Sequence, residues 1–119
     1  MKLEIFKYRR EQILKYPEMF NDFVDKLINA YNGQITIILF GSRGRRTNKE
    51  SSDFDIMIVL QKKTLEDYKK IYQLKPTGLP ADIVIVTPDE LKDQVIKQML
   101  VGSKIVYNGL NCFKEKVTQ

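Results

Sequence analysis

The stretch ILFGSRGRRTNKESSDFDIMIVL, from Ile38 to Leu60, contains two apolar runs separated by a charged segment. Both runs are rich in β-branched residues and too short for typical helices, which predicts two strands that are buried on both faces. The segment that joins them opens with a Gly-Ser pair at Gly41 and runs into two aspartates, Asp53 and Asp55, at the head of the second run. The stretch therefore predicts a strand–loop–strand unit that gathers charged side chains at one end of a sheet.

Helices are predicted on both sides of this unit. Residues 20 to 31 repeat apolar side chains at helical spacing, which predicts an amphipathic helix with Pro17 in its first turn. Residues 6–16 form either a separate helix or an extension of this one. After the second strand, Thr64 and Asp67 predict a capped helix start. The packed side of that helix is expected to hold Leu65, Tyr68, Ile71 and Tyr72.

The C-terminal part of the chain predicts two more strands with a helix between them. ADIVIVT at 81–87 is a third β-branched run, and KIVYNG at 104–109 is a short last strand. TPDEL at 87–91 predicts a capped helix start, with Leu91, Val95 and Met99 at helical spacing and an end at Gly102. The order predicts an α/β (α+β) fold, with a small mixed sheet of about four strands and helices packed on one face.

Length and charge limit the functions to consider. A chain of 119 residues predicts one domain spanning 1–119, with a core at about 20–108. Its net charge of +5 suits a phosphate-bearing ligand, a nucleic acid or an acidic partner. A lysine-rich solvated surface is the commoner origin of such a charge. Charge alone therefore does not choose among these partners.

The rarest residue types exclude several chemistries. The chain has no histidine, which excludes serine–histidine and cysteine–histidine catalysis and histidine-ligated zinc. Cys112 is the single cysteine, so no disulfide can form within the chain, as is usual in a reducing compartment. We find no apolar signal segment at the start and no run long enough to span a membrane, and we expect a cytoplasmic protein.

Three aspartates carry the clearest chemical signal. Asp53 and Asp55 stand two residues apart at a strand start, so their side chains are expected on one face, about 6.6 Å apart along it. Asp82 opens the strand at 81–87 and would join them if the two strands are neighbours. Carboxylates that converge repel one another unless a cation lies between them, and oxygen ligands suit Mg²⁺ or Mn²⁺. The simpler alternative is that these are solvated strand ends.

The joining segment offers groups that could hold a phosphate. Gly41 allows the backbone to approach a ligand closely, and a helix starting at Ser42 would direct N–H groups and a hydroxyl at an anion. Four basic residues follow: Arg43, Arg45, Arg46 and Lys49. Arginine pairs with phosphate in a bidentate manner, although Arg46 and Lys49 are expected to be merely solvated.

Together these residues resemble the nucleotidyltransferase fold of the DNA polymerase beta superfamily, above all its minimal nucleotidyltransferase (MNT-type) branch. The shared pattern is Gly41-Ser42, ten intervening residues, the acidic pair Asp53-x-Asp55, and Asp82 at the head of a later strand. The resemblance extends from about residue 20 to residue 108. One departure is Arg46, where relatives often carry glycine, as in GSRARG against GSRGRR here.

The resemblance implies a role for each matching residue. Catalytic and metal-ligating roles fall to Asp53, Asp55 and Asp82. Nucleotide binding falls to Gly41, Ser42, Arg43 and Arg45. The implied reaction moves a nucleoside monophosphate, AMP from ATP above all, onto an acceptor hydroxyl with two Mg²⁺ ions or with Mn²⁺.

The resemblance also implies a partner. Larger relatives add a domain that binds the acceptor, whereas only eleven residues follow Asn108 here, so we expect the acceptor to arrive on another protein. Members of the minimal branch are often encoded beside a small helical HEPN-type protein and form a toxin–antitoxin pair with it, in which the nucleotidyltransferase resembles an antitoxin that adds AMP to the toxin. For this chain we expect such a partner and a homo- or hetero-oligomer. Two alternatives remain. One is an antitoxin that acts by contact alone. The other is a transferase for small molecules or nucleic acid ends that needs a partner subunit. Action on nucleic acid is the least favoured because we identify no basic stretch interleaved with aromatic residues.

Overall fold

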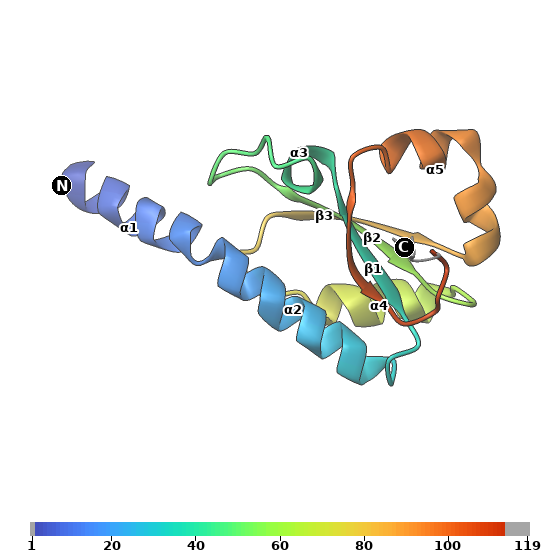
Figure 1. The fold of residues 1–119 in the computed structure, drawn as a ribbon. Helices are drawn as coiled ribbons and strands as arrows, with labels where there is room; N and C mark the ends of the chain where they lie inside the picture. The colour runs from blue at the N-terminus through green and yellow to red at the C-terminus, as the bar shows by residue number, and fades with distance from the viewer. Residues whose placement is uncertain (1, 114–119) are drawn as a thin grey trace, which may run out of the picture.

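The computed structural model describes residues 2–113 and contains a mixed four-stranded sheet in these residues, in the order β3-β2-β1-β4 (Figure 1). The strands are β1 (Thr36–Phe40), β2 (Phe54–Val59), β3 (Ala81–Val86) and β4 (Lys104–Asn108). β1 pairs antiparallel with β2 and with β4, while β2 and β3 are parallel. The four predicted strands and the predicted mixed sheet are therefore confirmed.

Two helices, α2 (Tyr16–Ala30) and α4 (Leu65–Leu74), cover one face of the sheet. Their apolar side chains and those of alternate strand positions form the larger core, as the alternation of strand side chains between faces requires. The buried members of α2 are Phe20, Phe23, Val24 and Leu27, which is the predicted helical stripe.

The second helix of this face packs through a different stripe from the one predicted. Ile71 is fully buried, and Tyr68 and Leu74 are partly buried against the core. Leu65 and Tyr72, expected on the packed side, are 79% and 48% exposed. The packed side follows the spacing of Tyr68, Ile71 and Leu74, so the prediction for Leu65 and Tyr72 was wrong.

The other face of the sheet is covered as well, by the 3-10 helix η1 (Pro88–Lys92), by α5 (Gln94–Met99) and by residues 110–113. The prediction of helices on one face is corrected accordingly. Strands that are apolar on both sides need cover on both sides. Here Ile38, Met57 and Val59 point away from α2 and pack against this second layer.

The segment after β3 was predicted as one helix and is instead two short ones. Asp93 adopts an extended backbone conformation between them, and its carboxylate accepts a hydrogen bond of 2.8 Å from the Val95 N–H. Asp93 thus ends η1 and caps α5. The change of register leaves Val95 67% exposed and turns Ile96 toward the sheet.

A separate helix, α1 (Lys2–Leu14), precedes α2 and projects from the domain (Figure 1). A break at Lys15 separates the two helices. Pro17 explains the break, because its ring opposes the carbonyl four residues earlier, at Ile13, and it has no N–H to donate. The open alternative between a separate helix and an extension is thereby settled in favour of a separate helix.

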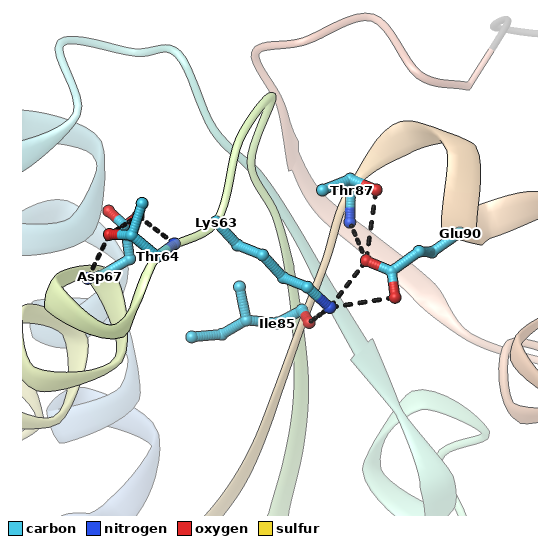
Figure 2. Close-up of polar contacts among 6 residues, drawn as sticks. All are labelled: Lys63, Thr64, Asp67, Ile85, Thr87 and Glu90. Atoms are coloured by element: carbon cyan, nitrogen blue, oxygen red, sulfur yellow. Dashed lines mark hydrogen bonds and ion pairs between the residues drawn. The ribbon is translucent and has the colours of Figure 1, made fainter.

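Figure 2 shows how the loops at the far end of the sheet are connected. Lys63 Nζ lies 2.7 Å from Glu90 Oε1 and donates to the Ile85 carbonyl at 3.3 Å. The same glutamate closes the capping box of Thr87, and Thr64 with Asp67 closes the one that begins α4. Both predicted capping boxes are present. Within residues 2–113, no helix is long and apolar enough to cross a membrane.

Candidate active site

The end of β1 leads directly into a short helix, α3 (Gly41–Gly44), which lies beside the start of β2 (Figure 1). Gly41 has a φ of +67°, a conformation that favours glycine. A Cβ at this position would collide with the Asp55 carboxylate. Gly41 therefore serves a second purpose besides the turn, since it lets the backbone of α3 pass against the side chain of Asp55.

The structure brings the predicted acids to one edge of the sheet. Asp55 and Asp82 are register partners on the parallel strands β2 and β3, and Asp53 stands one residue before β2. As register partners on parallel strands, Asp55 and Asp82 project on the same side of the sheet, and Asp53 lies close enough to raise the pKa of Asp55. This side also carries Met57 further along β2. The condition set from the sequence, that the two strands be neighbours, is met.

The electrostatics of Asp55 reflect this crowding. Burial raises the pKa of the Asp55 carboxyl, and the nearby charges of Asp82 and Asp53 raise it further, while Arg45 acts in the opposite direction. A carboxylate that is disfavoured by two others in the same place is stabilised by a bound cation. The three acids thus form one electrostatic unit and are not three independent strand ends.

The carboxylates of the three aspartates suit a hard divalent cation, although they do not form a complete coordination site by themselves. Among residues 2–113, no three His, Cys, Asp or Glu side chains converge tightly enough to make a ready-formed metal centre. Mg²⁺ does not need one, because it keeps several waters and is bound through one or two carboxylates together with substrate phosphates. The oxygens of Asp53, Asp55 and Asp82 are of the type that Mg²⁺ and Mn²⁺ prefer.

Arg43 holds the loop that follows α3. Its Nε donates to the Ser52 carbonyl and its Nη2 to the Glu50 carbonyl, both at 2.9 Å. The guanidinium also lies over the ring of Phe54, 3.7 Å from the centroid. Burial lowers the pKa of the Arg43 guanidinium, and the negative charge of Asp53 opposes this shift only in part. The side chain therefore ties the chain just before Asp53 to the first residue of β2.

In the turn after α3, the departure from the family pattern places an arginine where the backbone favours glycine. Arg46 has a φ of +60°, the left-handed region that glycine adopts most readily, so the glycine of relatives at this position has a conformational reason. Gly44 is needed for space, since a Cβ there would lie 2.5 Å from the Leu39 carbonyl oxygen. The turn closes with a bond of 2.9 Å from the Thr47 N–H to the Ser42 carbonyl.

The remaining predicted residues lie around this edge, and their roles stay predictions. Ser42 is half-buried in the first turn of α3, and Arg45 is exposed. Arg45 is close enough to lower the pKa of Asp55. Its aliphatic chain runs past Gly102, where an added Cβ would lie 2.8 Å from Arg45 Cγ.

Sequence reasoning missed one contribution to this site. A cavity of about 420 Å³ has Asp53 in its wall, and α1 supplies Tyr8, Arg9 and Gln12 to the same wall. The signal was present in the sequence as FKYRR at residues 6–10. This is a basic stretch interleaved with aromatic residues, so the earlier finding of none was wrong.

Comparison with known proteins agrees with the geometry. The family model described as "Polymerase beta, Nucleotidyltransferase" matches residues 24–109. The chain therefore belongs to the polymerase beta nucleotidyltransferase family, and nucleotidyl transfer is the general activity of its fold and site. A search of curated protein sequences finds no match.

A solved structure supports the same fold. The crystal structure of a candidate nucleotidyltransferase from Sulfolobus solfataricus superposes with a TM-score of 0.57. The two chains share 17% identity over 80% of this chain and 82% of the other. At that identity the likeness establishes the shared fold and nothing finer.

Proposed function

We propose that this protein transfers a nucleoside monophosphate, AMP from ATP, to a hydroxyl group on a partner protein. One observation carries the proposal. Asp55 and Asp82 are register partners on parallel strands, with Asp53 beside them and the backbone of Gly41 against Asp55. This arrangement places a carboxylate cluster and a tight glycine turn at one sheet edge, which is what a triphosphate with its cation requires.

Different residues bind the phosphates, hold the cations and position the acids in an in-line displacement. The backbone of Gly41 and Ser42 binds the β- and γ-phosphates, and Arg45 offsets negative charge as it develops. Divalent cations held by Asp53, Asp55 and Asp82 would supply charge neutralisation and orientation of the reacting oxygens. Arg43 keeps Asp53 in place through the loop carbonyls rather than by contact with the nucleotide.

The bond changes balance without any further reagent. The acceptor oxygen forms a bond to the α-phosphorus, and the bond from that phosphorus to the bridging oxygen breaks, so that pyrophosphate leaves. The hydroxyl proton passes to a base, for which Asp82 is the best placed carboxylate because β3 is the edge strand beside β2. No histidine is needed, as the composition of the chain requires.

The partner follows from the family resemblance. A HEPN-type toxin, modified on a hydroxyl and so neutralised, is the acceptor that the minimal branch suggests. The competing hypothesis is neutralisation by contact alone. One variant distinguishes the two hypotheses. Asp53→Asn should abolish neutralisation of the toxin in cells under the catalytic hypothesis and leave it intact under the contact hypothesis.

The direct experiment measures label transfer. Purified protein is incubated with Mg²⁺, ATP labelled at the α-phosphate and a panel of acceptors that includes the proteins that co-purify with it. The control is the Asp53→Asn, Asp55→Asn double variant, which keeps side-chain size while removing two charges. Transfer by the wild type well above the double variant supports the proposal. Equal transfer by both across the panel refutes it.

A further inference from the structure

A groove runs between α1 and the loop that precedes β2. It consists of two adjoining cavities of about 540 and 420 Å³, which share Arg9, Ile13 and Ser51. The first cavity is bounded by α1 on one side and by residues 49–51 of the loop on the other. The second continues to Asp53 and to Pro80, immediately before β3. The groove therefore leads to the edge of the sheet that carries the acids.

The lining of this groove combines apolar and charged side chains, and its basic residues Arg9, Arg10 and Lys49 outnumber the acidic Glu50 and Asp53. Phe6 and Ile13 supply apolar surface in the first cavity, beside Arg9, Arg10 and Lys49. Tyr8 and Tyr16 supply aromatic surface in the second. A ligand that fills the groove therefore needs both apolar side chains and negative charge.

The helix that forms one wall is unusually exposed. Among its side chains, Leu3, Ile5, Phe6, Tyr8 and Leu14 are more than half exposed, from 54% to 76%. Residues 2–15 also carry five basic and two acidic side chains, so a large part of the net charge of the chain lies here. Exposed apolar surface combined with a net positive charge marks an interaction surface more often than an ordinary solvated helix.

Charge and chemistry select among the occupants of the groove. A second copy of this chain would bring α1 against another α1 of the same positive charge, which opposes association. Single-stranded nucleic acid would use the arginines and aromatic rings but not Ile13, the aliphatic side chain that lines both cavities, nor the exposed Leu3, Ile5 and Leu14 elsewhere on α1. A protein surface with acidic and apolar side chains uses all of them.

We propose that this groove is the docking site for the acceptor protein. The acceptor places an apolar side chain against Phe6 and Ile13, pairs acidic side chains with Arg9 and Arg10, and so brings its hydroxyl past Asp53 to the aspartate cluster. α1 and the loop thus select the partner, while the sheet edge performs the transfer. The term acceptor rests on the proposed nucleotidyl transfer, whereas the docking itself does not.

The test uses the full chain, isotope-labelled for NMR, and three defined probes at low salt. The first probe is a short peptide of glutamate and leucine around one tyrosine, and the second replaces its glutamates by lysines. The third is an oligoadenylate RNA of the same charge as the acidic peptide. We expect the acidic peptide to shift the amide signals of residues 6–16 and 49–53 and to bind more weakly as salt is added, because the contacts are between exposed charges.

Variants decide where the peptide binds. Arg9→Glu with Arg10→Glu is expected to weaken binding by about tenfold or more, since two attractive contacts become repulsive. The matched control, Lys62→Glu with Lys97→Glu, makes the same change of charge on exposed side chains outside the groove and is expected to alter affinity less than about twofold.

Each remaining outcome has a defined meaning. Tighter binding of the RNA, shifts outside the groove, or no binding of the acidic peptide would each overturn the docking proposal. The Asp53→Asn, Asp55→Asn variant should bind the peptide at least as well as the wild type. A protein that binds the peptide in the groove but transfers no label would therefore refute the proposed function and leave the docking site standing.

Discussion

The guanidinium of Arg43 offers the sharpest single test of how this site is built. The sequence suggested that Arg43 contacts the nucleotide, whereas the structure directs its donors at the carbonyls of Ser52 and Glu50 and its plane at the ring of Phe54. Phe54 in turn stacks on Phe20 of α2, with ring centroids 5.0 Å apart. Replacing Arg43 by alanine should therefore destabilise the folded protein in the absence of any ligand.

The size of the effect follows from these three contacts. The partly buried bond to Ser52 contributes about 1–1.5 kcal/mol and the exposed bond to Glu50 about 0.5 kcal/mol. The stacking on Phe54 adds about 0.5–1 kcal/mol. The expected loss is thus about 2–3 kcal/mol in the free energy of unfolding. For a chain of this length it corresponds to a fall in Tm of about 6–12 °C.

Urea unfolding and thermal unfolding of the purified, ligand-free protein measure this loss. Lys49→Ala serves as the matched control, because it removes one positive charge from the same loop at an exposed side chain and should change stability by less than about 0.5 kcal/mol. Arg43→Lys should fall between the two, since a lysine keeps the charge but lacks the planar fork. If Arg43→Ala unfolds within about 0.5 kcal/mol of the wild type, the positioning role is refuted and Arg43 is free for phosphate.

Three further predictions follow from single contacts. Gly41→Ala should reduce label transfer by about a hundredfold, because its Cβ displaces the Asp55 carboxylate. Tyr31→Phe should cost about 0.5–1 kcal/mol in unfolding free energy at neutral pH, since Tyr31 donates a bond of 2.8 Å to Asp67. Burial raises the pKa of the Asp67 carboxyl, but the hydrogen bonds from Tyr31 and Thr64 outweigh burial, so the pKa is lowered overall. The stability that the Tyr31 bond contributes should therefore disappear as the pH falls below about 4 in acid unfolding. Arg46→Val should be less stable than Arg46→Gly by about 1–2 kcal/mol in urea unfolding, because Arg46 has a φ of +60°.

Each of these has an opposite result that counts against it. Full transfer activity in Gly41→Ala would mean that Asp55 does not need the close backbone. A stability difference between Tyr31→Phe and wild type that stays constant throughout acid unfolding would show that the lost contact is not to an ionised Asp67. Equal stability of the valine and glycine variants at position 46 would show that the turn does not hold this residue in the left-handed region.

Much of the fold could be predicted because its strands are apolar on both faces. Such runs at 36–40, 54–59 and 81–86 have few alternatives to a buried sheet, and capping residues such as Thr64 and Thr87 mark helix starts locally. The helices were less predictable in their packing. Whether Leu65 or Leu74 of α4 faces the core depends on where α2 lies. After β3, Asp93 interrupts a pattern of apolar residues that would otherwise predict a single helix.

The site was predictable to the same extent as its strands. The spacing of Asp53 and Asp55 predicted that the two acids lie together, and Asp82 joins them only because β2 and β3 are neighbours. By contrast, the partners of Arg43 are backbone carbonyls several residues away, and no residue type marks a carbonyl as an acceptor. The groove depends on how α1 lies relative to the loop at residues 49–51, which the sequence of residues 6–16 left open.

The central claim is that the glycine turn and the aspartates form one site for a nucleotide with its cation. Calorimetric titration of ATP into the protein, with and without Mg²⁺, tests it most directly in the wild type and in Asp55→Asn. The account predicts that Mg²⁺ strengthens ATP binding by about tenfold or more in the wild type and has little effect in the variant, because the cation joins the phosphates to the carboxylates. An equal effect of Mg²⁺ in both proteins would contradict it.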